Sequence, residues 1–73
     1  MTEIRLDLLG EVCPIPLLKV KKKLNELTSE QKLIIITDHT QAVRNIMNLL
    51  EKKNYDFEVE DVEVGLWEIE VYN

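Results

Sequence analysis

The sequence predicts an α+β fold, a two-layer sandwich in which two helices cover one face of a four-stranded mixed sheet. Three observations indicate this architecture. Apolar and polar residues alternate near both ends of the chain, which is the two-residue period of β-strands. Two inner segments instead repeat their apolar residues every three or four positions, as amphipathic helices do. A short continuous apolar run separates these segments, so the expected order is β-α-β-α-β-β.

Length and composition fit one small domain over residues 1–73, with 45% apolar residues to form its core. Nine Lys and Arg against fourteen Asp and Glu give a formal net charge of −5. This acidic balance argues against direct nucleic-acid binding, which needs a basic face. A single cysteine excludes an internal disulfide, and the longest apolar run is too short for a membrane helix. A soluble, cytoplasmic protein is therefore expected.

The first strand covers residues 3–8, where apolar and charged side chains alternate. The first helix follows two prolines and carries an apolar stripe at helical spacing. This stripe consists of Leu17, Val20, Leu24 and Leu27. On the opposite side the helical wheel places Lys19, Lys22 and Lys23. That basic face is either a solvated surface or a docking patch for an acidic partner.

The second strand is the continuous apolar run of residues 33–36, a leucine and three β-branched isoleucines, as expected of a strand that is covered on both faces or central in its sheet. Asp38 and Gln41 have the spacing of a capping-box variant at the start of the second helix. The apolar face of this helix consists of Ala42, Val43, Ile46, Leu49 and Leu50. Because a helical crossover joins the first two strands, they should be parallel.

The last two strands alternate over residues 55–60 and 67–72, and Gly65 marks the turn between them. Four glutamates then lie on the helix-free face of this hairpin, at positions 58, 60, 68 and 70. Their negative charge serves either solubility or the docking of a basic partner.

Cys13 is the strongest candidate for chemistry. Pro14 disfavours helical geometry at the residue before it and is itself suited to the first helical position, so Cys13 is expected to be the N-cap and Pro16 to lie near the third position. The positive end of the helix dipole then favours the thiolate, the nucleophilic form of cysteine. The competing interpretation is a small buried apolar residue. A zinc site is disfavoured, because the chain has one cysteine and one histidine.

His39 is a second candidate. If the first two strands are parallel, both following helices begin at the same edge of the sheet, where open α/β sheets bind ligands. Cys13 and His39 would then be neighbours beside two helix N-termini, an arrangement suited to a sulfate-like or thiosulfate-like anion. The alternative is an exposed first-turn histidine without a role.

Residues 7–16, with the sequence DLLGEVCPIP, resemble the signature of the TusA family of small sulfur-carrier proteins, also called SirA-like. The pattern D-x-x-G-x-x-C-P-x-P comprises Asp7, Gly10, Cys13, Pro14 and Pro16. The resemblance extends over nearly the whole chain, and the β-α-β-α-β-β order is also that of the family.

The resemblance implies that Cys13 takes up sulfane sulfur as a persulfide and relays it from a donor protein to an acceptor protein. Asp7, Gly10, Pro14 and Pro16 would shape the loop that carries this cysteine, and the chemistry needs no cofactor or metal. Family members serve tRNA thiolation, sulfur oxidation and other sulfur transfers. The alternative, from a different functional class, is a non-catalytic regulatory or interaction module of the same fold.

Residues 37–42 and Trp67 are more similar to the YeeD branch of this family than to the tRNA-thiolation branch. The YeeD branch is paired with the YeeE membrane transporter for thiosulfate, which would make thiosulfate and the transporter the expected partners. The chain departs from both branches at position 39. Proline is typical there in the tRNA branch and a YeeD relative has a second cysteine, whereas this sequence has His39.

Overall fold

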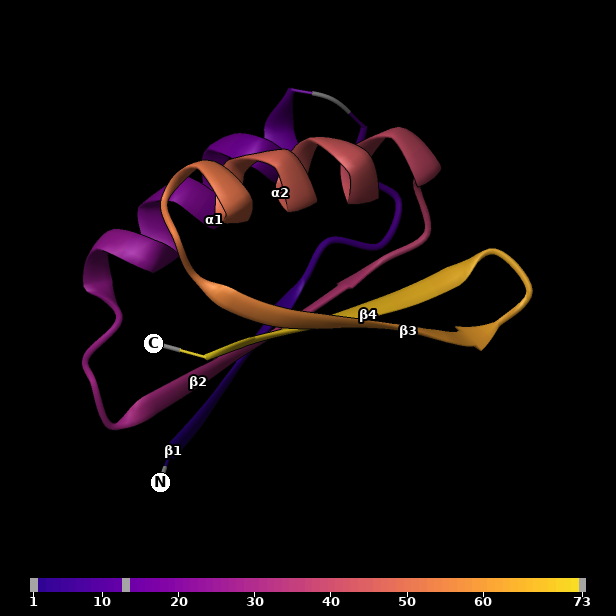
Figure 1. The fold of residues 1–73 in the computed structure, drawn as a ribbon. Helices are drawn as coiled ribbons and strands as arrows, with labels where there is room; N and C mark the ends of the chain where they lie inside the picture. Colours follow the sequence, from indigo (N-terminus) through magenta and orange to yellow (C-terminus); the bar gives the residue numbers. More distant parts are fainter. Residues whose placement is uncertain (1, 13, 73) are drawn as a thin grey trace.

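A computed structural model describes residues 2–12 and 14–72 of the chain. Its elements are β1 (Thr2–Asp7), α1 (Ile15–Glu26), β2 (Gln31–Thr37), α2 (Thr40–Lys52), β3 (Asp56–Glu63) and β4 (Leu66–Tyr72). Both helices lie on one face of the sheet (Figure 1), so the predicted two-layer α+β architecture is confirmed. In this described part of the chain, no helix is long and apolar enough to cross a membrane.

The sheet has the strand order β1-β2-β4-β3. The first two strands are parallel, as predicted, and Ile4 lies opposite Leu33. The two other pairings are antiparallel, so the sheet is mixed. Because β1 and β2 run in the same direction, the loops that lead into α1 and α2 leave the sheet at the same edge.

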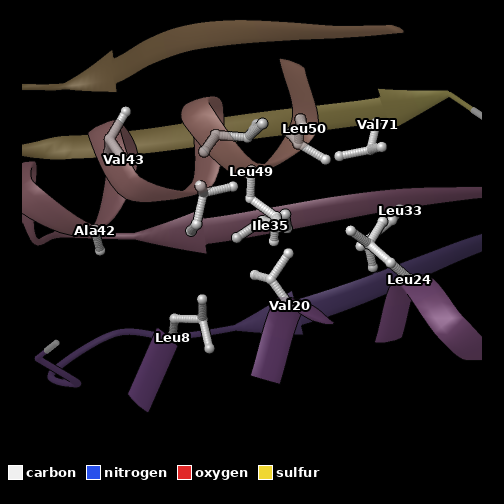
Figure 2. Packing of buried hydrophobic residues seen from close by; sticks show 12 residues of the cluster. Leu8, Val20, Leu24, Leu33, Ile35, Ala42, Val43, Leu49, Leu50 and Val71 are labelled. Carbon is white, nitrogen blue, oxygen red and sulfur yellow. The ribbon is translucent and has the colours of Figure 1, made fainter. Parts of the chain in front are cut away.

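The core fills the space between the helices and the sheet. Figure 2 shows Val20 and Leu24 of α1 on one side of the core and the side chains of α2 on the other. The apolar faces predicted for the helices are confirmed, since Val20 and Leu24 are buried together with all five predicted residues of α2. Each large apolar side chain buried here contributes about 1.5–3 kcal/mol to folding. This packing fixes how the two helix N-termini sit over the sheet.

The apolar run in β2 is explained by the strand's central position between β1 and β4. Leu33 and Ile35 face the helices and are fully buried. Ile34 has the opposite orientation, yet only 4% of its surface is exposed. Residues 33–35 of β2 are therefore buried on both faces of the sheet.

The helix-free face of the hairpin is acidic, as predicted. Glu58 lies directly opposite Glu70, and Glu60 lies opposite Glu68. Like charges opposite one another on a sheet destabilise it. The Lys32 ammonium group lies 3.4 Å from the Glu70 carboxylate and offsets part of this repulsion.

A hydrogen bond also joins Tyr72, in the last strand, to Glu70. The Tyr72 hydroxyl donates to Glu70 Oε2 at 2.7 Å. The bond lowers the pKa of Glu70 and, together with partial burial, raises the pKa of Tyr72 to about 12. Lys32 also lies over the Tyr72 ring, with its Nζ 5.3 Å from the ring centre.

The turn of the β3–β4 hairpin lies at Gly65, as predicted from its place between two alternating segments. Its φ of 78° is in the left-handed region that glycine adopts at little cost. In Figure 1 this turn extends beyond the helices.

Candidate functional site

The start of α1 differs by one residue from the prediction. The N-cap is Pro14, whose carbonyl accepts a hydrogen bond from the Leu18 N–H at 3.2 Å, and Pro16 is the second helical residue. A turn precedes the helix, because the Ile15 N–H bonds to the Val12 carbonyl, and this turn shifts the first helical residue to Ile15. The expectation that Cys13 is the N-cap is therefore wrong. Cys13 itself lies outside the described residues.

The loop before Cys13 has every backbone N–H from residue 8 to residue 11 in a hydrogen bond. The Leu8 N–H donates to the Ile36 carbonyl of β2 at 2.8 Å. The Leu9 N–H donates to Asp7 Oδ1 at 3.0 Å. The Glu11 N–H returns to the Leu8 carbonyl and closes a turn in which Gly10, with φ of 78°, is the third residue. A positive φ at that position is typical of a type II turn.

Asp38 supplies the remaining contact of this loop. Its Oδ1 accepts a hydrogen bond from the Gly10 N–H at 3.1 Å, across 28 residues of sequence. The predicted capping box of Asp38 and Gln41 is therefore wrong: α2 has His39 at its N-cap, and no side chain caps it. The Gln41 side chain instead donates to Asn45 Oδ1 at 3.3 Å. The Asp38 carboxylate thus joins the two loops rather than capping the helix that follows it.

His39 directly follows Asp38 and is partly buried. Its backbone is extended and its N–H donates to the hydroxyl of Thr37 at 3.2 Å. Since Asp38 contacts Gly10, the segment that carries His39 lies beside the loop that leads to Cys13. The predicted convergence of the two helix-start loops is confirmed, whereas the contact between His39 and Cys13 stays a prediction.

The three predicted docking lysines border a surface hollow of about 300 Å³ beside α1, whose other lining residues are Leu6 and Glu26. Two of the lysines are engaged in ion pairs. Lys19 lies 2.7 Å from the Glu11 carboxylate, and Lys23 lies 3.6 Å from Glu26. Lys22 is exposed. The pair between Lys19 and Glu11 also fastens the loop before Cys13 to the helix after it.

Four exposed apolar side chains flank Cys13 in the sequence, two on each side. Their exposed fractions are 47% for Leu9, 60% for Val12, 43% for Ile15 and 55% for Leu18. We call these four residues the apolar rim. This feature was not predicted from the sequence, although Leu18, which lies beside the buried stripe of α1, was a signal for it.

The described residues contain no group of three or more His, Asp or Glu side chains close enough to share a metal ion. What the site does offer is two helix N-termini on one edge of the sheet, a loop whose N–H groups are hydrogen-bonded from residue 8 to residue 11, and exposed apolar side chains on both sides of Cys13 in the sequence. Helix N-termini attract anions through their free N–H groups and the helix dipole. This arrangement is suited to an anionic group that a second macromolecule approaches.

The sequence pattern of the family described as "Sulfurtransferase TusA" matches residues 4–72. The chain belongs to the TusA family. Two archaeal relatives carry names that assign them as candidate sulfur carriers. The protein of Archaeoglobus fulgidus is 38% identical over 65 residues, covering 88% of this chain and 74% of the relative. That of Methanocaldococcus jannaschii is 39% identical over 51 residues, covering 70% of this chain and 68% of the relative.

The fold is also that of a solved member of this group. The crystal structure of a SirA-like protein from Desulfitobacterium hafniense superposes with a TM-score of 0.82 at 29% identity, covering 92% of each chain. Membership in the TusA family supports a role as a sulfur carrier, which exchanges sulfur with donor and acceptor proteins.

Proposed function

We propose that Cys13 carries the transferred sulfur as a persulfide. The Cys13 thiolate attacks the sulfane sulfur of a donor, the new S–S bond forms, and the donor group leaves with the electron pair of the broken bond. With thiosulfate as donor, the leaving group is sulfite. A thiolate of the acceptor protein then attacks the terminal sulfur and releases the Cys13 thiolate. Neither step needs an external oxidant or reductant, or a cofactor.

The observation that carries this proposal is the junction of the two loops by the hydrogen bond between Gly10 and Asp38. It brings together the loops that lead into α1 and α2, and α1 begins two residues after Cys13 in the sequence. A persulfide is more acidic than a thiol and is therefore held as an anion before transfer, and helix N-termini stabilise anions. The first turn of α1 contains no acidic residue that would oppose this effect.

Thiosulfate is the small-molecule donor that we favour, with His39 as the residue that helps to hold it. A protonated imidazole, or its N–H as a hydrogen-bond donor, would attract the sulfonate oxygens of thiosulfate. The corresponding partner is a membrane thiosulfate transporter of the YeeE type, as the similarity of residues 37–42 to the YeeD branch suggests. The carrier would then act in the cytoplasm, on the inner side of the transporter.

Donor and acceptor proteins would dock on the apolar rim and beside Lys19, Lys22 and Lys23. A partner thiolate must reach the Cys13 sulfur, so its protein has to cover the residues that flank Cys13. Burying the rim in that complex removes apolar surface from water, and the lysines attract an acidic partner over a longer range.

Intact mass spectrometry tests the proposal. The reduced protein should gain about 32 Da, the mass of one sulfur atom, when it is incubated with thiosulfate or with a cysteine desulfurase and cysteine. Cys13→Ser should gain none, and a second reduction should remove the added mass. A mass gain that survives in Cys13→Ser would refute the assignment of the site. Loading by the desulfurase alone would favour a tRNA-thiolation relay over thiosulfate use.

The same experiment separates a carrier from a non-catalytic module of this fold. Such a module would take up no sulfur from any donor while binding its partners normally. Thiosulfate-dependent loading followed by transfer to a second thiol protein would exclude it.

A further inference from the structure

We infer that Asp38 is a positioning residue for sulfur transfer, acting through the turn that leads to Cys13. This inference rests on the proposed function and deepens it. Asp38 does not belong to the sequence signature of residues 7–16, and its contact with that signature arises only in the folded chain. Its carboxylate accepts a hydrogen bond from the Gly10 N–H at 3.1 Å.

The turn needs this contact because two of its four N–H groups have no backbone partner. Those of Leu8 and Glu11 bond to carbonyl oxygens, whereas those of Leu9 and Gly10 bond to the carboxylates of Asp7 and Asp38. The bond from Asp7 is local, since it spans two residues. The bond to Asp38, in contrast, ties the turn to the loop that leads into α2.

The backbone around Asp38 is itself held in place by its two sequence neighbours. It follows Thr37, the last residue of β2, which is fully buried. The Thr37 hydroxyl accepts the N–H of His39, so the backbone on either side of Asp38 is fixed. A carboxylate anchored in this way can hold Gly10 at a defined distance from β2, and a one-ångström error in such positioning is costly for a transfer step.

The geometry makes Asp38 the link between the two helix starts. When the bond is lost, the turn keeps its contacts to Ile36 and Asp7 but can move relative to α2. Sulfur transfer then slows without unfolding of the core. The role requires an acceptor oxygen at position 38, not a negative charge.

Two substitutions separate the acceptor oxygen from the charge. Asp38→Asn keeps an oxygen that can accept the Gly10 N–H, whereas Asp38→Ala has none. Asp61→Ala is the matched control, since Asp61 is an exposed aspartate of β3, a strand that β4 separates from β2. We expect Asp38→Ala to lower the rate of sulfur loading by about three- to tenfold, with Asp38→Asn within about twofold of the unsubstituted protein. Asp61→Ala should load at the normal rate.

Hydrogen exchange of the Gly10 amide supplies the direct readout. It should become faster in Asp38→Ala and stay slow in Asp38→Asn, while the midpoint of thermal unfolding stays close to that of Asp61→Ala. Equal loading in all variants would overturn the inference, and so would equal losses in Asp38→Ala and Asp38→Asn, because charge would then be the cause.

The alkylation rate of Cys13 by iodoacetamide distinguishes this inference from the proposed function. Should the unsubstituted protein take up no sulfur, the proposed function fails and alkylation replaces loading as the readout. Asp38→Ala must then differ from both Asp38→Asn and the unsubstituted protein. Identical alkylation rates in the three proteins would overturn the positioning role.

Discussion

The hydroxyl of Thr37 accepts a hydrogen bond from the backbone N–H of His39 at 3.2 Å, so a fully buried strand residue fixes the backbone where α2 begins. An anion site at this edge would therefore have a histidine held by the fold rather than by a mobile loop. The His39 side chain is only partly buried.

His39→Ala should reduce thiosulfate-dependent loading of Cys13 by about two- to fivefold, the range that one favourable charge or hydrogen bond provides near a helix end. Loading by a protein donor should fall less, because such a donor brings its own active-site groups. Loading rates with the two donors, measured by intact mass, check the difference. Equal losses with both donors would remove His39 from the site.

Gly10→Ala and Gly65→Ala form a matched pair, because both glycines have φ of 78° and neither has an atom within 4 Å of an added Cβ. Each substitution should cost about 1–2 kcal/mol of stability, the price of left-handed backbone for a residue with a Cβ. Only Gly10→Ala should also slow sulfur loading, since Gly65 lies in the turn between β3 and β4 and not in a loop that leads into a helix. Thermal unfolding and loading rates test the pair. A loading defect in Gly65→Ala of the same size would show that lost stability alone is the cause.

Reversing Lys19, Lys22 and Lys23 to Glu should slow transfer to an acidic partner protein by about tenfold at low salt, through lost electrostatic steering. Stability should change by less than about 1 kcal/mol for each lysine, as is usual for exposed ion pairs. Reversal of Lys21, Lys52 and Lys53 is the control. These three lysines line a separate hollow that Asn25 and Leu49 also border, and their reversal changes the net charge by the same amount.

The transfer rates should differ between the two triple variants at low salt and converge as salt is added. Equal rates at low salt would mean that net charge, and not a docking face on α1, controls the encounter.

Tyr72 should titrate near pH 12, because its hydrogen bond to Glu70 raises its pKa to about that value. The folded pKa exceeds the ordinary value of about 10. The neutral phenol therefore stabilises the fold fully below about pH 10, and this contribution is lost as the pH rises to about 12. Phenolate absorbance in Tyr55→Phe reports Tyr72 alone, since the chain has two tyrosines. Adding Glu70→Ala should move the midpoint toward 10, and an unchanged midpoint would contradict the assigned cause.

Periodicity was sufficient to predict the elements of this fold. The stripe with Val20 and Leu24, the β-branched run of β2 and the two alternating segments each predict one type of structure, and the crossover rule gives the parallel pair. The position of β4 between β2 and β3 depends on which sheet edge remains open after β1 and β2 have paired, and local patterns do not encode that choice.

The candidate site was predictable only in part. The parallel strands imply that the two helix-start loops meet, and the motif points to Cys13. The bond between Asp38 and Gly10 was not predicted, because at position 38 a local capping interaction competes with a tertiary one, and only the folded geometry decides between them. The one-residue shift in the start of α1 has a similar origin, since the turn between Val12 and Ile15 precedes the helix.

Strand β3 forms one outer edge of the sheet, and its outward backbone N–H and C=O groups could pair with a strand of another molecule. Five of its eight residues are acidic. Two copies joined along β3 would bring these carboxylates against one another, which makes edge-to-edge growth into fibrils unfavourable near neutral pH. Charge repulsion along β3 thus disfavours aggregation. Acidification neutralises the carboxylates and would remove this protection.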